Sequence, residues 1–414
     1  MAYCYTCNRN TDIYDAQFCT FCGAKFHLGK RELPYEVDEE LSVYHWLDYG
    51  KENVFLDYSV QRTDAFSYCI RDTRANDLRI KKVFKVKPDT IYYVTADVKT
   101  EDVVNHENTE NPIGACISTN DWFCSRSLFG TNDWQTIGVL GRSDDAGNLM
   151  VSLNLGYTFN TCCGSAWFEN FRFTPAERYV KGGNTWRFLA VLVTESGIET
   201  YDEESERYLS LSHTMSEAER TAIRQSLYNF ERDFTRDGEG LIGAKVDILE
   251  LRAKCTAYTK SDIGYLISGP DACRYLEDNG VRIEAYDHVF MIVCQPSLPV
   301  KYYGLGGLPI KNRVGFSFIL HADVENSLHY LSGKRENSWP SAIYMHEFLH
   351  SIESCANSLG LPVPMVDGER SGYADLDEYR LWYHDFIHNK IEGNQRGRGV
   401  DSRILRLRPS LFQP

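Results

Sequence analysis

The stretch Ile343-Tyr344-Met345-His346-Glu347-Phe348-Leu349-His350-Ser351-Ile352-Glu353 decides how the C-terminal part of this chain folds and which chemistry it can carry. It holds a His-Glu-x-x-His motif. In a helix of about 3.6 residues per turn, His346 and His350 project from one face and can bind one metal ion. Glu347 lies beside that ion without binding it, where it can take a proton from a water molecule. The motif therefore predicts a zinc hydrolase, most often a peptidase.

The flanking residues predict that the motif lies in the middle of a long helix. Pro340 suits the first helical position, with Ser338 or Trp339 as the entry to the helix. An N–H group at that position has no partner within the helix, so proline loses nothing by lacking one. Gly360 stands where a left-handed C-terminal cap belongs. We therefore expect a helix over residues 340–359. The alternative is a helix whose histidines merely lie on a polar face, since the motif can also occur by chance.

Length and composition indicate a globular protein of two or three domains. The chain has 414 residues, of which 43% are hydrophobic and 25% charged. Its formal net charge of −14 argues against a nucleic-acid partner. No secretion signal or membrane-spanning stretch is visible, and 13 cysteines fit reduced thiols better than a disulfide framework. We expect a cytoplasmic location and no membrane partner.

Two cysteine knuckles at the start of the chain predict a structural zinc site. The four cysteines of Cys4-x-x-Cys7 and Cys19-x-x-Cys22 can bind one zinc ion tetrahedrally through their thiolates. Residues 1–30 resemble the short zinc-ribbon modules of many bacterial proteins, and they are too few to fold without the metal. A structural or protein-docking role is favoured over nucleic-acid binding. The alternative is four free thiols that happen to be so spaced.

The next part of the chain predicts a linker followed by an all-β domain. Residues 31–50 are acidic and are interpreted as a linker. Residues 51–178 show short alternating runs bounded by Gly, Asn and Asp, which is typical of a sandwich or barrel. The candidate strands are residues 78–86, 91–99, 114–118, 135–141, 149–155 and 166–173.

Residues 51–178 resemble the β-jelly-roll modules of the carbohydrate-binding type. The resemblance lies in Lys85-Val86-Lys87-Pro88-Asp89-Thr90 leading into residues 92–99, in Gly130-Thr131-Asn132-Asp133-Trp134-Gln135, and in Gly164-Ser165-Ala166-Trp167-Phe168-Glu169-Asn170-Phe171. It implies a glycan ligand as one alternative, with Trp122 or Tyr157 stacking on a sugar. A structural role is favoured, because aromatic residues in such a sandwich are more often core.

Residues 184–414 predict a domain with strands ahead of the motif helix. A strand is expected at residues 186–193, and Ser216-x-x-Glu219 is a capping box that opens a helix. The other expected elements are strands at residues 244–251, 288–294 and 313–321 and a helix at residues 270–278. This order is similar to that of zincin-type peptidases, so the resemblance implies an α+β zincin-like domain. It also implies an edge strand that pairs with extended substrate, assigned to residues 315–319.

The same region resembles a clostridial family of zincin-like proteins in which a similar β-module precedes the peptidase domain. The matching residues are Tyr286-Asp287-His288-Val289-Phe290, Gly304-Leu305-Gly306, Gly315-Phe316-Ser317, His346-Glu347-Phe348-Leu349-His350, Gly372-Tyr373 and Trp382-Tyr383-x-Asp385. The resemblance implies a metallopeptidase in which Tyr373 stabilises the oxyanion.

A catalytic zinc ion normally has three protein ligands, so one remains to be found beyond the two histidines. Asp367 comes first after the chain turns back, and Glu369 or Glu378 are alternatives, as is His384. The resembling family has a histidine where Asp367 stands, so this chain departs from that pattern. Asp367 could also be a solvated loop carboxylate. Glu353 is too close to His350 to share the ion comfortably and is expected to hold that histidine instead.

The sequence thus predicts a multidomain zinc metallopeptidase with one catalytic and one structural zinc ion and a peptide or protein substrate. The competing hypothesis is a binding or adaptor protein that uses the ribbon and jelly roll, with a degenerate zincin scaffold. The presence of Glu347 favours the enzyme, because a scaffold has no need of a general base.

Overall fold

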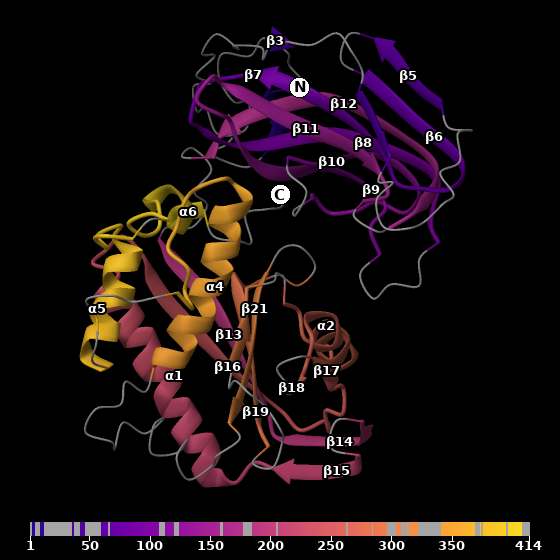
Figure 1. Ribbon diagram of the computed structural model, residues 1–414. Helices are drawn as coiled ribbons and strands as arrows, with labels where there is room; N and C mark the ends of the chain where they lie inside the picture. The colour runs from indigo at the N-terminus through magenta and orange to yellow at the C-terminus, as the bar shows by residue number, and fades with distance from the viewer. Residues whose placement is uncertain are drawn as a thin grey trace.

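The structure is a computed structural model in which the chain forms a β-sandwich followed by an α/β domain (Figure 1). It describes residues 67–407 apart from internal gaps, of which residues 322–340 are the longest. Before residue 67 it gives only the backbone of short strands. Strand β12 (Cys162–Pro175) ends the sandwich, and β13 (Thr185–Val193) begins the α/β domain.

The predicted zinc ribbon falls almost entirely outside the described residues. Two short strands, β1 (Ala2–Cys4) and β2 (Arg9–Thr11), pair as an antiparallel hairpin. Cys7, Cys19, Cys22 and the side chain of Cys4 are not among the described groups. The structural zinc ion therefore stays a prediction from the cysteine spacing.

The all-β prediction is confirmed, because the described strands of this region form two antiparallel sheets. In the first sheet the order is β10-β8-β12-β6-β5, and in the second it is β3-β7-β11-β9, with β4 also paired to β7. Successive side chains of a strand point to opposite faces of its sheet. The apolar side chains on the inner faces of the two sheets pack together in one buried core. The bounds are β3 (Tyr35–Glu36), β4 (Ser42–His45), β5 (Ser59–Asp64), β6 (Ser67–Asn76), β7 (Leu78–Lys85), β8 (Ile91–Asn105), β9 (Ala115–Ser118), β10 (Gly130–Arg142) and β11 (Asn148–Leu155).

Two expectations about this region need correction. Residues 31–50 are not wholly the predicted linker, because β3 and β4 from this segment pair with β7. Tyr157, a predicted candidate for stacking on a sugar, has a buried side chain, and the Arg79 guanidinium lies 4.5 Å from its ring centre. Tyr157 therefore belongs to the interior, and Trp122, the other candidate, lies outside the described residues.

The second domain is a layered α/β structure rather than the expected α+β arrangement. Its sheet has the order β16-β13-β19-β21-β20, and the first four strands run parallel to their neighbours. Only β20, at the edge, is antiparallel. The strands are β16 (Gly243–Leu251), β19 (His288–Cys294), β20 (Gly304–Gly306) and β21 (Gly315–His321).

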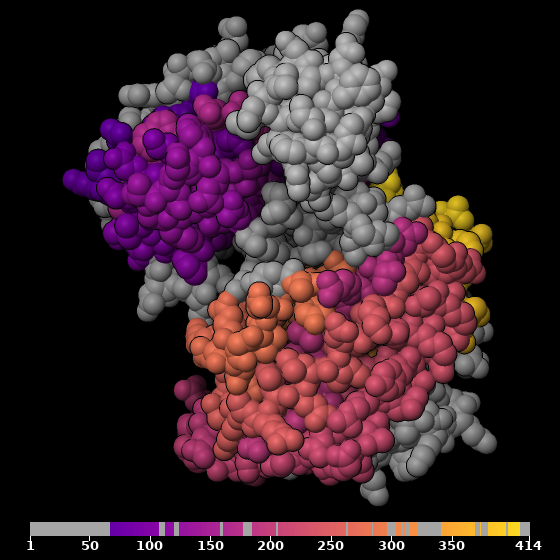
Figure 2. Space-filling model, turned by 180° about the vertical axis from the view of Figure 1, so that it is seen from behind, coloured from indigo at the N-terminus to yellow at the C-terminus, as the bar shows by residue number. Residues whose placement is uncertain are grey.

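Helices and hairpins cover both faces of this sheet (Figure 1). The helices α1 (Glu217–Asp237), α4 (Ala342–Ser358), α5 (Leu376–Ile387) and α6 (Ser402–Leu407) lie on one face. The other face carries α2 (Gly269–Asp278) and the hairpins β14–β15 (Glu195–Asp202, Arg207–Thr214) and β17–β18 (Thr259–Ser261, Gly264–Leu266). Seen from behind, the segment from β14 to α2 forms most of the coloured surface of this domain (Figure 2).

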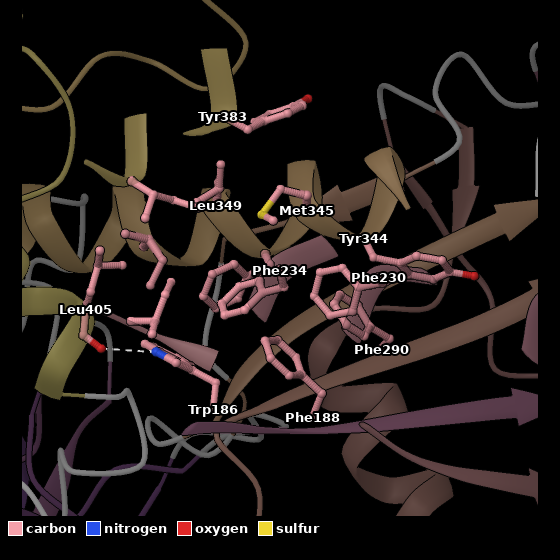
Figure 3. Packing of buried hydrophobic residues seen from close by; sticks show 14 of the residues in the cluster. Trp186, Phe188, Phe230, Phe234, Phe290, Tyr344, Met345, Leu349, Tyr383 and Leu405 are labelled. Carbon is pink, nitrogen blue, oxygen red and sulfur yellow. Dashed lines mark hydrogen bonds between the residues drawn. The ribbon is translucent and has the colours of Figure 1, made fainter. Parts of the chain in front are cut away.

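The alternation of side chains along β13 explains the two layers. Trp186 and Phe188 point towards α1 and α4, whereas Leu189 and Val191 pack on the α2 side. On the first face, aromatic rings from the sheet and the helices form one cluster, in which the Trp186 Nε1–H donates to the Leu405 carbonyl at 3.0 Å (Figure 3). Burying each such side chain stabilises the fold by about 1.5–3 kcal/mol. This packing fixes α4 against the sheet.

Helix α4 begins and ends close to the predicted positions. Its N-cap is Ser341, whereas the predicted entry residues lie outside the described part of the chain. Gly360 has φ +64°, the left-handed conformation predicted for it. The Leu361 N–H then donates to the Ala356 carbonyl at 2.9 Å, which closes the helix end.

The sandwich meets the α/β domain at the end where α6 and the C-terminus of α4 lie (Figure 1). Arg142 pairs with Asp89 at 2.7 Å and donates to the Gly360 carbonyl at 3.0 Å. From α6, Arg403 donates to the Asp89 carbonyl at 2.9 Å. Tyr93 is part of the same buried cluster as the aromatic core of the α/β domain. The two domains therefore share apolar core as well as polar contacts.

No described helix combines the length and the apolar character that crossing a membrane would require. The nine cysteines that the structure describes are free thiols, and all but Cys163 are buried.

A buried histidine in the α/β core makes stability depend on pH. Burial lowers the pKa of His288 to about 3, and its Nδ1 has no hydrogen-bond partner among the described residues. The unfolded chain binds a proton with a pKa of about 6.5, so stability is complete above that pH and is lost as the pH falls towards 3. Between pH 7 and 5 we expect His288 to contribute a loss of about 2 kcal/mol.

The substitution His288→Gln tests this expectation, because the neutral amide can still bond with Ser317, whose hydroxyl lies 2.9 Å from His288 Nε2. Urea denaturation at pH 7 and pH 5 should show a smaller loss of stability in the variant. An equal loss in both proteins would mean that His288 is not the titrating group. His321, whose pKa burial lowers to about 4, should account for part of the remaining loss.

Candidate metal centre

Three of the predicted ligands come together on one side of α4. His346 Nε2 and His350 Nε2 lie 3.2 Å apart, as their spacing of four residues on a helix requires. Asp367 Oδ1 lies 3.1 Å from His346 Nε2, and Asp367 Oδ2 lies 3.5 Å from His350 Nε2. The structure therefore brings together the three residues that the sequence predicts as ligands of the catalytic ion.

The triangle of ligand atoms fits a zinc ion. Bonds of about 2.0–2.1 Å in a tetrahedral zinc site place the ligand atoms ~3.3–3.4 Å apart, because that distance is ~1.63 times the bond length. The two histidine nitrogens are 3.2 Å apart, and the two Asp367 oxygens lie 3.1 Å and 3.5 Å from one histidine each, which is close to this value. One ligand atom from each of the three residues lies within 4.8 Å of the other two. Two imidazoles and one carboxylate are also a donor set that zinc accepts, with a fourth position left for water or substrate.

The loop after α4 carries Asp367 back to the helix. The positive φ of Gly360 reverses the chain, and Val363 and Val366 are buried against the domain core. The Val366 N–H donates to Glu353 Oε2 at 3.0 Å, which ties the loop to α4 next to Asp367. Local apolar burial and one backbone hydrogen bond thus position a carboxylate whose own side chain is 68% exposed.

Each histidine has a polar partner on its other ring nitrogen. Glu353 Oε2 lies 3.6 Å from His350 Nδ1, the place expected of a residue that holds this histidine. The hydroxyl of Tyr383, on α5, lies 3.0 Å from His346 Nδ1. Such partners fix the orientation of a ligating imidazole and leave its Nε2 for the ion. Sequence reasoning missed Tyr383, because nothing in its spacing from the motif points to His346.

The electrostatics of the site depend on the surrounding carboxylates. Burial opposes a charge on His350, but Glu353, Glu347 and Asp367 together raise its pKa above the ordinary value. Burial raises the pKa of Glu347 to about 8; His350 opposes this shift and Asp367 adds to it. A cation at the three ligand atoms would favour the ionised form of Glu347.

Glu347 is placed beside the ligands but does not belong to the triangle. Its side chain is buried, and its Oε2 has no hydrogen-bond partner among the described residues. An unpartnered buried carboxylate oxygen costs folding free energy, so natural structures keep few of them without a ligand or function. The orphaned oxygen is consistent with a group that meets a water molecule or substrate at this site.

Strand β20 lies directly against the helix at Glu347. A Cβ at Gly304 would come within 2.0 Å of Glu347 Oε1, and one at Gly306 within 2.2 Å of the Glu347 carbonyl oxygen. Residues 315–319 were assigned to the edge of the sheet, which is wrong: β21 lies between β19 and β20, and β20 is the edge strand. Only glycine allows this edge to approach the motif helix so closely.

The substitution Gly304→Ala should displace the Glu347 carboxylate while the ligands stay in place. The added methyl group meets a side-chain oxygen rather than backbone, so the domain can still fold. A misplacement of about 1 Å at a catalytic group can lower turnover ~100-fold, which is the loss we expect in hydrolysis. Zinc content, measured by elemental analysis, should not change.

The matched control is Gly243→Ala in β16 of the same sheet, because a Cβ there would meet its nearest neighbour, Thr235, at an ordinary contact distance of 3.7 Å. It should retain zinc and most of the turnover. Equal activity of Gly304→Ala and wild type would show that the close approach of β20 to Glu347 does not matter for function.

Two of the remaining predicted residues have other described partners. The Tyr373 hydroxyl donates to Asp385 Oδ2 at 2.7 Å, and its described contacts do not include the three ligands. His384 lies in a different cluster, with Glu239 and His388. The side chains of Glu369 and Glu378 are outside the described residues.

Comparisons with known proteins leave the family open. No protein-family model matches this chain, and no curated protein matches it. A solved structure described as "CBM4 structure and function" is 16% identical, covering 33% of this chain and 86% of its own, with a TM-score of 0.23. The CBM22-1–GH10 modules of a Clostridium thermocellum xylanase are 9% identical over 57% of this chain and 43% of theirs, with a TM-score of 0.21.

A Podospora anserina GH26-CBM35 mannanase is 9% identical over 61% of this chain and 50% of its own, with a TM-score of 0.17. Two of the three chains are thus matched over half their length or less. At these TM-scores the similarities assign neither an activity nor a ligand to this chain. The three proteins contain carbohydrate-binding modules, whereas the sandwich itself is established by its strand topology. None of the three is described as a peptidase.

Proposed function

We propose that this protein hydrolyses peptide bonds with a zinc ion held by His346, His350 and Asp367. The observation that carries the proposal is the convergence of His346, His350 and Asp367, which offer one ligand atom each within 4.8 Å of one another, with Glu347 buried beside them. A carboxylate next to a three-ligand site, but outside it, is the arrangement that water activation requires. A metal site built only for stability would more often have four protein ligands and no orphaned carboxylate.

Each residue has a separate role in this proposal. Bound zinc would supply a Lewis acid and lower the pKa of water towards about 7. Glu347 accepts the proton of the attacking water and delivers it to the leaving amine. Tyr383 and Glu353 hold the two imidazoles so that their Nε2 atoms stay on the ion. The Tyr373 hydroxyl donates to Asp385 instead of facing the ligands in any described contact, so the proposal does not depend on it.

The edge of the sheet supports a peptide as substrate. β20 pairs with β21 on one side, and none of the described strands pairs with its other side. An unpaired strand edge offers backbone N–H and C=O groups that an extended peptide can match. Because β20 also touches the helix at Glu347, a peptide added to this edge would pass close to the ligands.

For the sandwich we propose a structural role. Tyr93 and Leu140 of the sandwich are buried in the same cluster as Trp186 of the α/β domain, and Arg142 bonds to the end of α4. These contacts are suited to holding the motif helix in place. Glycan binding stays the alternative for this module, to be decided by binding of a sugar class to the full chain.

The experiment that tests the proposed function is digestion of a diverse peptide library, read by mass spectrometry. New peptide termini should appear with the wild-type protein, disappear when a chelator removes zinc, and return when zinc is added. The absence of any zinc-dependent cleavage would overturn the proposal and favour the non-catalytic binding protein.

A further inference from the structure

A second group of metal-binding side chains lies where the end of α1 meets α5. It consists of Glu239, just after α1, and of His384 and His388 at the C-terminal end of α5. The spacing of four residues places both imidazoles on one face, with ring centres 4.5 Å apart. His384 Nε2 lies 3.1 Å from Glu239 Oε1, and His388 Nε2 lies 3.9 Å from Glu239 Oε2.

The orientation of His384 resembles that of a ligating histidine. Its Nδ1 lies 3.0 Å from Asp385 Oδ1, and the other oxygen of Asp385 accepts the Tyr373 hydroxyl at 2.7 Å. A carboxylate on one ring nitrogen, itself held by a hydrogen bond, is the common outer support of a metal-bound histidine. This chain of contacts also gives Tyr373 and Asp385 a role outside the catalytic site.

The end of α1 adds to the attraction for a cation. The C-terminus of a helix carries partial negative charge on its carbonyl groups. The His388 Nε2–H donates to the Asp237 carbonyl oxygen at 2.8 Å, so this nitrogen exchanges that hydrogen bond for the ion when it acts as a ligand. The Asp237 carboxylate is occupied by Arg236 and Arg380 at 2.8 and 3.0 Å, so these cations do not compete for Glu239.

We propose that Glu239, His384 and His388 bind a second divalent transition-metal ion, of the zinc class, that fastens α5 to the end of α1. Two imidazoles and a carboxylate select zinc over magnesium or calcium, which prefer oxygen ligands. His384 and His388 are mostly buried, with 22% and 11% of their side chains exposed, while Glu239 keeps the site open to solvent. The ion would therefore act on stability and on the placement of α5.

The position of α5 affects the catalytic centre through one residue that neighbours His384. Tyr383, which contacts His346, immediately precedes His384 on α5. Fixing His384 to α1 therefore also fixes the segment that presents Tyr383. The inference is nevertheless independent of peptide hydrolysis, since it concerns a separate set of ligands.

Zinc bound per full-length chain, measured by elemental analysis after dialysis against a weak chelator, tests the second site. His388→Ala should lose one equivalent relative to wild type, His346→Ala should lose a different one, and the combined variant should lose two. The control is His213→Ala, because His213 also pairs with one glutamate, Glu219, at 3.0 Å and has 23% of its side chain exposed. This control should lose none.

A second variant tests the site in case His388→Ala does not fold. Glu239→Gln keeps the size of the side chain and should weaken zinc binding at this site by ~10-fold or more, seen as a smaller zinc-dependent rise in Tm. If His388→Ala and Glu239→Gln keep the wild-type zinc content and Tm shift, the second site is overturned and the cluster is an ion pair only. If His388→Ala loses one equivalent of zinc and His346→Ala loses none, the second site is supported and the proposed catalytic zinc site is contradicted.

Discussion

Replacing Glu347 by glutamine should leave zinc bound and lower peptide hydrolysis by a factor of ~100 to 10,000. The carboxylate lies outside the triangle of ligand atoms, so its loss removes no bond to the ion. The amide is nearly the same size, which matters because Gly304 and Gly306 pack against this residue. What the variant loses is the group that accepts a proton from the attacking water.

The measurement is the rate of cleavage of a peptide found in the library, together with zinc content. Glu217→Gln is the control, because Glu217 is an exposed glutamate at the start of α1 whose described partners include Arg220 and Arg224 and none of the three ligands. It should cleave at the wild-type rate. Unchanged cleavage by a zinc-loaded Glu347→Gln protein would remove the general base from the mechanism and with it the main support for an enzyme.

The features that the sequence predicts best are those that depend on a local pattern of residues. The apolar run over residues 288–294 matches β19 at both ends, and the capping box at Ser216 and Glu219 is present with both of its hydrogen bonds. Gly360 has the predicted left-handed backbone. In each case the determining interactions are within a few residues of the chain, so the pattern contains the information.

Features that depend on pairing between distant segments could not be read in the same way. The backbone of β20 is only three residues long, and its place at the edge follows from pairing with β21. The contact of Tyr383 with His346 joins two helices whose packing is set by the whole core. The α/β rather than α+β organisation likewise rests on parallel pairing between β13, β16 and β19.

The position of the third ligand combines both kinds of information. The sequence predicts Asp367 because it is the first acidic residue after the turn. Its approach to the histidines also depends on the hydrogen bond that the Val366 N–H donates to Glu353. Sequence order gave the candidate, and tertiary contacts of the loop bring it to 3.1 Å from His346. The signal that would have found His384 and His388 as a separate pair is their spacing of four on one helix face.

Replacing Asp367 by alanine should remove zinc from the catalytic site and abolish hydrolysis. The variant keeps only two of the three protein ligands, and we expect zinc affinity to fall by more than the ~10- to 100-fold typical of losing an outer partner. Because the Asp367 side chain is 68% exposed, the substitution should leave the fold intact. Competitive titration with a chromophoric chelator measures the affinity, and circular dichroism checks the fold.

Asp367→His is the matched variant, because an imidazole at this position can also bind zinc. It should restore zinc binding that Asp367→Ala loses. Retention of zinc by Asp367→Ala would show that this carboxylate is not a ligand and would move the third position to Glu369 or Glu378. Loss of zinc in Asp367→Ala, with recovery in Asp367→His, requires instead that the ligand at position 367 completes the site formed by His346 and His350.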